Sequence, residues 1–252
     1  GIRGALAKAA GIRQIGGSNP MDRVALVRFL LAVLYWCKGS PAGPEEKDGV
    51  LAAGRFPPEW FAKLRREECR FDLFGDGERF MQPPDPQAAS ERPVADLFHE
   101  MPGDTNVAHF MHTRDCKTGV CPACAALGLA RLPVTITGKG SGKRSGINGA
   151  PPIYFLPVGR SLLETLLVNW TGDQEDGTPC WFEPEAGRKH EKVFHAEGFT
   201  WTSRQFRLVQ GSSGRCILCD DATSCLVREL GEANEPNGRE GMSGSDRWCD
   251  PH

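Results

Sequence analysis

A central helix of this chain is predicted by two neighbouring stretches, Ser18-Asn19-Pro20-Met21-Asp22 and the apolar run VALVRFLLAVLYWC at residues 24–37. Its start offers a polar helix cap, a proline suited to the first helical turn and an early acid. Because the residues that follow are apolar on almost every side, the pattern predicts a helix packed on most of its surface. The run is interrupted by Arg28 and is too short to cross the hydrocarbon core of a bilayer, which is about 30 Å thick. We therefore expect a central buried helix and no membrane partner.

Shorter elements are expected around this helix. Residues 58–66 favour a short helix, and the capping-box spacing of Ser161 and Glu164 predicts another that ends near Trp170. Three further segments alternate in the manner of strands: Leu132 to Thr137, Ile153 to Leu156 and Phe199 to Gln210. Because short strands are scattered among helices without a βαβ rhythm, the chain is predicted to have a mixed α+β fold with an irregular, loop-rich outline.

The composition limits the class of function. With 252 residues and 40% hydrophobic content, the chain can build a sizeable core. Its formal charge of -2 does not fit a protein that binds nucleic acid over its whole surface. Between Lys117 and Leu163, however, there is no Asp or Glu, so any nucleic-acid contact is expected from this stretch. The N-terminus lacks the pattern of a secretory signal, and a cytoplasmic protein is therefore predicted.

Ten cysteines are many for a cytosolic chain, and several sit in close pairs, which favours metal binding over a disulfide framework. Cys121 and Cys124 form one CxxC pair, and Cys216 and Cys219 form another. At this spacing both sulfurs of a tight turn can meet one tetrahedral ion. Four thiolates would close the coordination shell, so we expect a structural Zn²⁺ that staples two distant segments and takes no part in catalysis.

Two alternatives to this ligand set remain open. In the first, the four cysteines are buried or free thiols that bind no metal, and their CxxC spacing is coincidental. Cys116 or Cys225 can also replace one of the four ligands, because each lies within reach of one of the two pairs.

A glycine-rich basic stretch, TGKGSGKRSG at residues 137–146, follows the first CxxC pair. Glycine lets a backbone approach another molecule closely, and cations suit phosphate, so a nucleic-acid contact is expected. The candidate residues are Gly138, Lys139, Gly140, Ser141, Gly142, Lys143 and Arg144. The stretch is not a Walker P-loop, because Arg rather than Ser or Thr follows Lys143, and nucleotide hydrolysis is disfavoured. A flexible basic linker is the alternative interpretation.

The order of these motifs along the chain resembles that of the CasA family, the large subunits of the type I-E CRISPR Cascade complexes. The matching pieces are the apolar helix after residues 19–20, FDLF at 71–74, FMQ at 80–82, residues 103–112, both CxxC pairs, the glycine-rich loop and GINGAPP at 146–152. The resemblance covers most of the chain. It implies that residues 1–252 are part of an N-terminal domain, without the family's opening segment and with its C-terminal helical bundle absent.

The resemblance also implies a function. A member of this family would be a non-catalytic subunit that recognises the protospacer-adjacent motif in double-stranded DNA, assists R-loop initiation and recruits a helicase-nuclease. Its other partners would be the remaining Cascade subunits and the CRISPR RNA. The segment matching residues 103–112 would reach the RNA end, with Thr105, Asn106 and Phe110 as the expected contacts. Residues 138–146 would enter the DNA minor groove, where readout is degenerate and phosphate contacts position the protein without specifying sequence.

Two other functions compete with this one. A zinc-stapled structural or RNA-binding module of another ribonucleoprotein assembly would share both the metal site and the basic loop. A hydrolase with a Cys or His nucleophile is disfavoured, because no Cys/His/Asp arrangement has a catalytic context and a closed thiolate shell is inert. We therefore predict that the chain is not an enzyme.

Overall fold

The computed structural model describes residues 1–17, 19–83, 88–98, 119–135, 153–172, 176–182, 194–202 and 204–233. The helices are α1 (Ile2–Ala7), α2 (Pro20–Lys38), α3 (Pro44–Ala53), α4 (Ala62–Arg66), α5 (Pro122–Thr135), α6 (Leu162–Asn169) and α7 (His195–Thr200). The strands are β1 (Ala88–Pro93), β2 (Phe206–Gln210), β3 (Gly214–Arg215), β4 (Ala222–Thr223) and β5 (Val227–Ala233). Short 3-10 turns lie at Ala9–Gly11 (η1), Pro58–Phe61 (η2), Glu68–Phe71 (η3) and Val94–Leu97 (η4). The predicted mixed α+β fold is confirmed.

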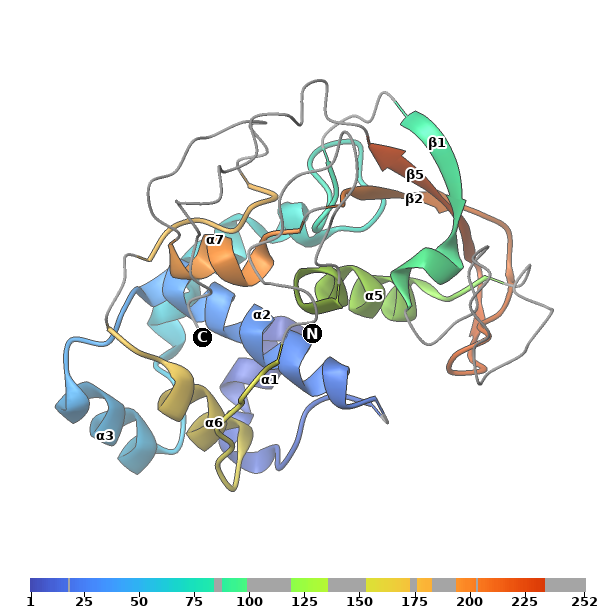
Figure 1. The fold of residues 1–252 in the computed structure, drawn as a ribbon. Coiled ribbons are helices and arrows are strands. Elements are labelled where there is room, and N and C mark those ends of the chain that lie inside the picture. The colour runs from blue at the N-terminus through green and yellow to red at the C-terminus, as the bar shows by residue number, and fades with distance from the viewer. Residues whose placement is uncertain are drawn as a thin grey trace.

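Helix α2 lies at the centre of the helical part of the molecule (Figure 1). The polar cap predicted within residues 18–22 is Asn19, whose side chain accepts a hydrogen bond from the backbone N–H of Met21 at 2.9 Å, and Pro20 opens the helix. Gly39, at φ 92°, ends it in a conformation that favours glycine. The helix packs against α5, α6 and α7 and is buried on most of its surface, as predicted. Among the described residues, no helix has the length and apolarity needed to span a bilayer.

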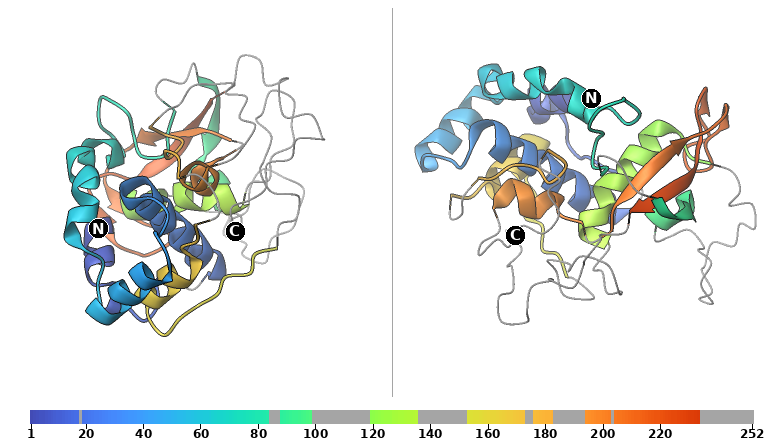
Figure 2. Two further views of the ribbon diagram at one scale, coloured as in Figure 1. Left: turned by 90° about the vertical axis from the view of Figure 1, so that its left-hand side faces the viewer. Right: turned by 90° about the horizontal axis from the view of Figure 1, so that it is seen from above.

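Helix α5 lies between α2 and the sheet, as Figures 1 and 2 both show. Arg131 of α5 donates a hydrogen bond to the Asp22 carboxylate in the first turn of α2, and each of these side chains is only 4% exposed. The Arg131 guanidinium also lies over the Phe98 ring, 5.4 Å from its centroid. A buried charge pair of this kind fixes the orientation of two helices, because neither charge tolerates the loss of its partner.

The main sheet is antiparallel, with strand order β1-β5-β2. Leu230 of β5 lies opposite Arg92 of β1 and opposite Leu208 of β2. Leu208 and Leu230 are both buried, as strand alternation towards a core requires. The buried Gln82 side chain accepts a hydrogen bond from the Leu208 N–H at 2.8 Å and donates one to the Leu73 carbonyl at 2.9 Å. This glutamine thus joins the aromatic segment after η3 to the edge of the sheet.

The predicted capping box at α6 is present in a modified form. Ser161 accepts a hydrogen bond from the Glu164 N–H at 3.2 Å, as expected for the N-cap. The Glu164 carboxylate, however, accepts from the backbone N–H of Arg160 at 2.8 Å, one residue before the cap. The helix ends at Asn169, next to the predicted end at Trp170.

Three predicted strands differ from the structure. Leu132 to Thr135 belong to α5, so the strand predicted there is wrong; positions 136–137 lie outside the described residues. Phe199 and Thr200 close α7, and the strand begins only at Phe206. Residues 153–156 belong to none of the helices or strands of the described part of the chain. In a helix packed on several sides, apolar residues occupy most positions, so a short run carries no clear period.

The buried ion pair between α2 and α5 gives a stability prediction. The Asp22→Ala substitution removes the carboxylate that Arg131 contacts inside the protein, so the free energy of unfolding should fall by about 3–5 kcal/mol. The exposed Asp48 of α3 is the control, and Asp48→Ala should change the free energy of unfolding by less than about 0.5 kcal/mol. Urea unfolding followed by circular dichroism measures both values. Equal effects of the two substitutions would show that the pair is not a stabilising contact.

Candidate metal centre

The first CxxC pair lies at the start of α5. Cys121 directly precedes Pro122, the first residue of the helix, and its sulfur accepts the backbone N–H of Cys124 at 3.5 Å. The preceding residue, Val120, pairs with Val227 of β5 through two backbone hydrogen bonds of 2.9 Å. A Cβ at Gly119 would collide with the Val227 carbonyl oxygen, so only glycine allows this close approach. The first pair is therefore held against the sheet by its own backbone.

The second CxxC pair forms the turn between the two short strands β3 and β4, which pair antiparallel. The Cys216 N–H donates to the Asp221 carbonyl and the Asp220 N–H donates to the Cys216 carbonyl, both at 2.9 Å. Asp220 adopts φ 60°, a left-handed conformation that aspartate tolerates better than most side chains. The Ile217 N–H donates to the Gly119 carbonyl at 3.3 Å, which joins the second turn to the first.

The structure brings all four predicted cysteines together. The sulfurs of Cys121, Cys124, Cys216 and Cys219 all lie within 4.8 Å of one another. The Sγ atoms of Cys121 and Cys219 are 3.6 Å apart. Four sulfurs around one tetrahedral ion at Zn–S distances of about 2.3 Å would be separated by roughly 3.8 Å. The cluster therefore has the dimensions and the donor set to hold a metal ion.

The thiol pKa values indicate how a cation would act on such a cluster. Burial raises the pKa of Cys216, but backbone hydrogen bonds from Cys121, Cys219 and Leu218 outweigh it and lower the pKa to about 7. Burial and the neighbouring sulfurs raise the pKa of Cys124. A backbone hydrogen bond from Asp221 lowers the pKa of Cys219, yet burial and the sulfurs of Cys216 and Cys121 raise it to about 11. One thiolate forms easily at this site, and further thiolates require a positive charge among them.

Four thiolate ligands leave no coordination position for water or substrate. An ion in this cluster would therefore join α5 to the β3–β4 hairpin and would not activate a reacting group. Cys225 is buried but lies outside the four-sulfur cluster, so it does not replace a ligand there. Cys116 lies outside the described residues.

The predicted nucleic-acid contacts also lie outside the described residues. They are Thr105, Asn106 and Phe110 in the first segment, and Gly138, Lys139, Gly140, Ser141, Gly142, Lys143 and Arg144 in the second. Gly119, which brings the two CxxC pairs together, was not among the residues predicted for the site. A glycine two residues before a metal-ligand pair is a signal that could have identified it.

The fold and the cysteine cluster together define a mixed α+β protein with a candidate closed-shell metal centre. A family model described as CRISPR-associated protein Cse1 matches residues 1–252, and the chain belongs to this family. The CRISPR-associated protein CasA/Cse1 of Thermus thermophilus is 31% identical over an alignment of 236 residues that covers 85% of this chain and 46% of that protein. The resemblance to the CasA family is confirmed.

Solved structures share the fold. The structure of Thermus thermophilus CasA (Cse1) matches with a TM-score of 0.67 and 25% identity, over 93% of this chain and 49% of that one. A chain of a CRISPR RNA-guided surveillance complex matches with a TM-score of 0.67 over 93% of this chain and 51% of that one. At 17% identity, this second match indicates a common fold alone. The chain spans about half the length of the relatives it matches.

The cluster geometry predicts a metal-dependent fold. The purified chain should contain about one metal ion, and Cys124→Ser or Cys216→Ser should remove most of it and lower the unfolding temperature by roughly 10 °C or more. The exposed Cys69 lies outside the cluster, so Cys69→Ser should leave metal content and unfolding temperature unchanged. Elemental mass spectrometry and thermal unfolding measure the two quantities. A metal-free, never-chelated wild-type chain with the same unfolding temperature as both cluster variants would contradict the prediction.

Proposed function

We propose that this chain is the motif-reading part of the large subunit of a CRISPR RNA-guided surveillance complex. The observation that carries the proposal is the match of the Cse1 family model along residues 1–252. The subunit would recognise the protospacer-adjacent motif in double-stranded DNA, assist R-loop initiation and recruit a helicase-nuclease. The subunit itself would not cut the DNA. Its further partners would be the other subunits of the complex and the CRISPR RNA.

We assign zinc as the metal of the cysteine cluster. Thiolate ligands favour zinc over magnesium, calcium and manganese, which take oxygen ligands, and a closed four-sulfur set is typical of a structural zinc site. In this role the ion supplies no chemistry and only joins segments. Its position along the chain is informative, because Cys121 and Cys124 open α5, and α5 ends at Thr135, just before Gly138. The metal would hold the helix from which the glycine-rich loop departs.

The proposed DNA contact follows from the chemistry of the loop. Gly138, Gly140 and Gly142 present bare backbone, which can approach the floor of a narrow minor groove. Lys139, Lys143 and Arg144 would neutralise nearby phosphates and hold the loop in register without reading sequence. Thr105, Asn106 and Phe110 would contact the RNA end. The target itself would be read by base pairing with the guide, as in other RNA-guided systems.

A charge-removal series tests the loop in the assembled complex. We expect the Lys139→Ala/Lys143→Ala/Arg144→Ala variant to weaken binding of motif-bearing duplex DNA. The slope of log Kobs against log salt concentration should become smaller in magnitude by roughly 2–3, because each lost phosphate contact reduces that slope by about 0.9. The control variant Lys8→Ala/Arg55→Ala/Arg66→Ala removes three exposed cations elsewhere and should behave like wild type. Electrophoretic mobility shifts over a salt series supply both numbers.

Two results would refute the proposal. The first is equal binding of motif-bearing and motif-free duplexes by the complex with the wild-type chain. The second is loss of RNA binding alone in the loop variant, with duplex DNA binding unchanged, which would favour an RNA-binding module of another ribonucleoprotein.

A further inference from the structure

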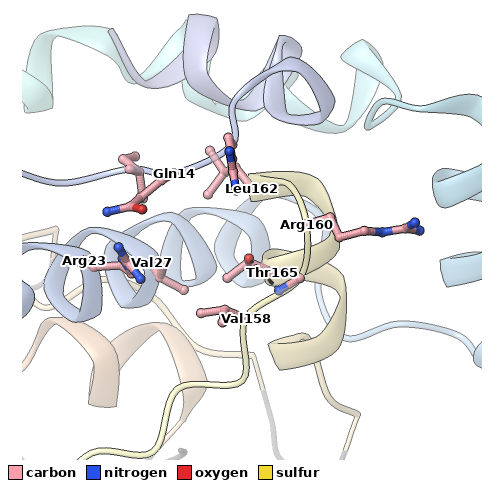
Figure 3. Close-up of a pocket in the computed structure, with 10 residues that line it drawn as sticks. Gln14, Arg23, Val27, Val158, Arg160, Leu162 and Thr165 are labelled. Carbon is pink, nitrogen blue, oxygen red and sulfur yellow. Dashed lines mark hydrogen bonds between the residues drawn. The ribbon is translucent and has the colours of Figure 1, made fainter.

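A cavity of about 200 Å³ lies where the segment after η1 meets the starts of α2 and α6. Its walls are partly apolar and are formed by Ile15, Val27, Val158 and Leu162. Figure 3 shows Val27, Val158 and Leu162 around one hollow, together with Thr165 of α6. The volume is below the roughly 300–1,000 Å³ of pockets that hold drug-sized ligands. It is too small for a whole cofactor.

Hydrogen bonds and a close backbone contact hold the segments around this cavity together. The Leu162 N–H donates to the Ile12 carbonyl at 2.7 Å, which ties the segment after η1 to the start of α6. Gly16 adopts φ 111°, and a Cβ there would lie 3.0 Å from the backbone nitrogen of Arg23. The Gly159 N–H donates to Thr165 Oγ1 at 3.0 Å, which folds the opposite wall against α6. The cavity is thus formed where residues 12–16 and the neighbouring start of α2 meet the start of α6, which is distant from both in sequence.

The charge around the cavity is positive. Arg13, Arg23 and Arg160 line it, and no carboxylate of the described residues does. In the part of the chain that the structure describes, Arg13 and Arg23 form no ion pair, whereas Arg160 contacts Glu164 at 3.3 Å. Figure 3 shows Arg23 and the Gln14 amide on the same side of the hollow, while Arg160 extends away from the other labelled residues.

We propose that this cavity binds a phosphate group of a nucleic-acid strand, with Arg13 and Arg23 as its cationic contacts and Gln14 as an amide donor. Arginine presents its N–H groups in a planar fork that matches the oxygens of phosphate. The apolar wall accommodates the sugar beside that phosphate, and Arg160, 93% exposed, can reach an adjacent phosphate outside the cavity. The cavity lining includes none of the residues of the proposed motif-reading loop, so the proposal does not depend on that loop.

A paired-charge experiment on the full chain tests the proposal. The Arg13→Gln/Arg23→Gln variant is compared with Arg55→Gln/Arg66→Gln, which removes the same charge from exposed positions outside the cavity. Fluorescence anisotropy measures binding of labelled single-stranded RNA and DNA of equal length over a salt series. We expect the cavity variant to bind both strands about tenfold more weakly, with a salt slope smaller by roughly 1.4, because each lost single-strand phosphate contact is worth about 0.7. The control variant should bind within about twofold of wild type.

Further arms separate the sources of phosphate. Inorganic phosphate, compared with chloride at matched ionic strength, should raise the unfolding temperature of wild type and not of the cavity variant. If the cavity variant loses this phosphate effect but still binds the strands as wild type does, the cavity binds free phosphate and not the phosphate of a nucleic-acid strand. Equal strand binding by the two variants together with an unchanged phosphate effect overturns the proposal. So does a wild-type chain that binds neither probe, or one that selects an acidic peptide over both strands.

A stability criterion excludes misfolding as the cause of weaker strand binding. The cavity variant must unfold within about 2 °C of wild type in chloride buffer, a difference that corresponds to a minor loss of stability for a chain of this size. A second variant, Arg13→Lys/Arg23→Lys, keeps the charge and loses the planar fork. It should recover part of the strand affinity. A loss of strand binding in the Gln variant without any recovery in the Lys variant would favour a purely structural role and overturn the proposal.

Discussion

The structure depends on the burial of α2. A helix that is apolar on almost every side has no solvent face, so the chain must supply packing partners around it. They come from distant parts of the sequence: α5, α6 and α7 all contact α2. The Tyr35 and His195 rings stack with centroids 3.9 Å apart, and the Trp170 indole N–H donates to the Gly39 carbonyl at 2.9 Å. Both contacts join α2, or the residue that ends it, to segments near or beyond residue 170.

The same burial explains what the sequence could and could not predict. The start of α2 was readable because its cap is local: Asn19 and Pro20 act on backbone groups within one turn. The start of α6 was readable for the same reason. The helical conformation of the last residues of α5 could not be predicted in this way. Leu132 and Val134 are buried on different sides of a crowded helix, so their pattern resembles strand alternation. Pro133 added to the ambiguity, since it is unusual inside a helix.

The cysteine cluster shows a second limit. The CxxC spacing predicts that each pair of sulfurs lies together, because that is a property of one tight turn. Whether the two pairs meet is decided elsewhere, by the pairing of Val120 with Val227 and by the close approach of Gly119 to β5. Those contacts are between residues far apart in sequence. The four-cysteine cluster is therefore a consequence of the strand register beside it, and an ion bound there would stabilise that register in turn.

The first turn of α2 links the core to the surface charge. Consecutive residues of a helix point about 100° apart, so Asp22 and Arg23 face different environments. Asp22 turns inward, where Arg131 neutralises it, and it is then unable to neutralise Arg23 at the cavity. A chain with a formal charge of -2 can therefore carry a local positive site, because one of its acids is paired in the interior. Net charge alone therefore does not describe the local charge of such a surface, because the position of each buried acid decides which cations stay unneutralised.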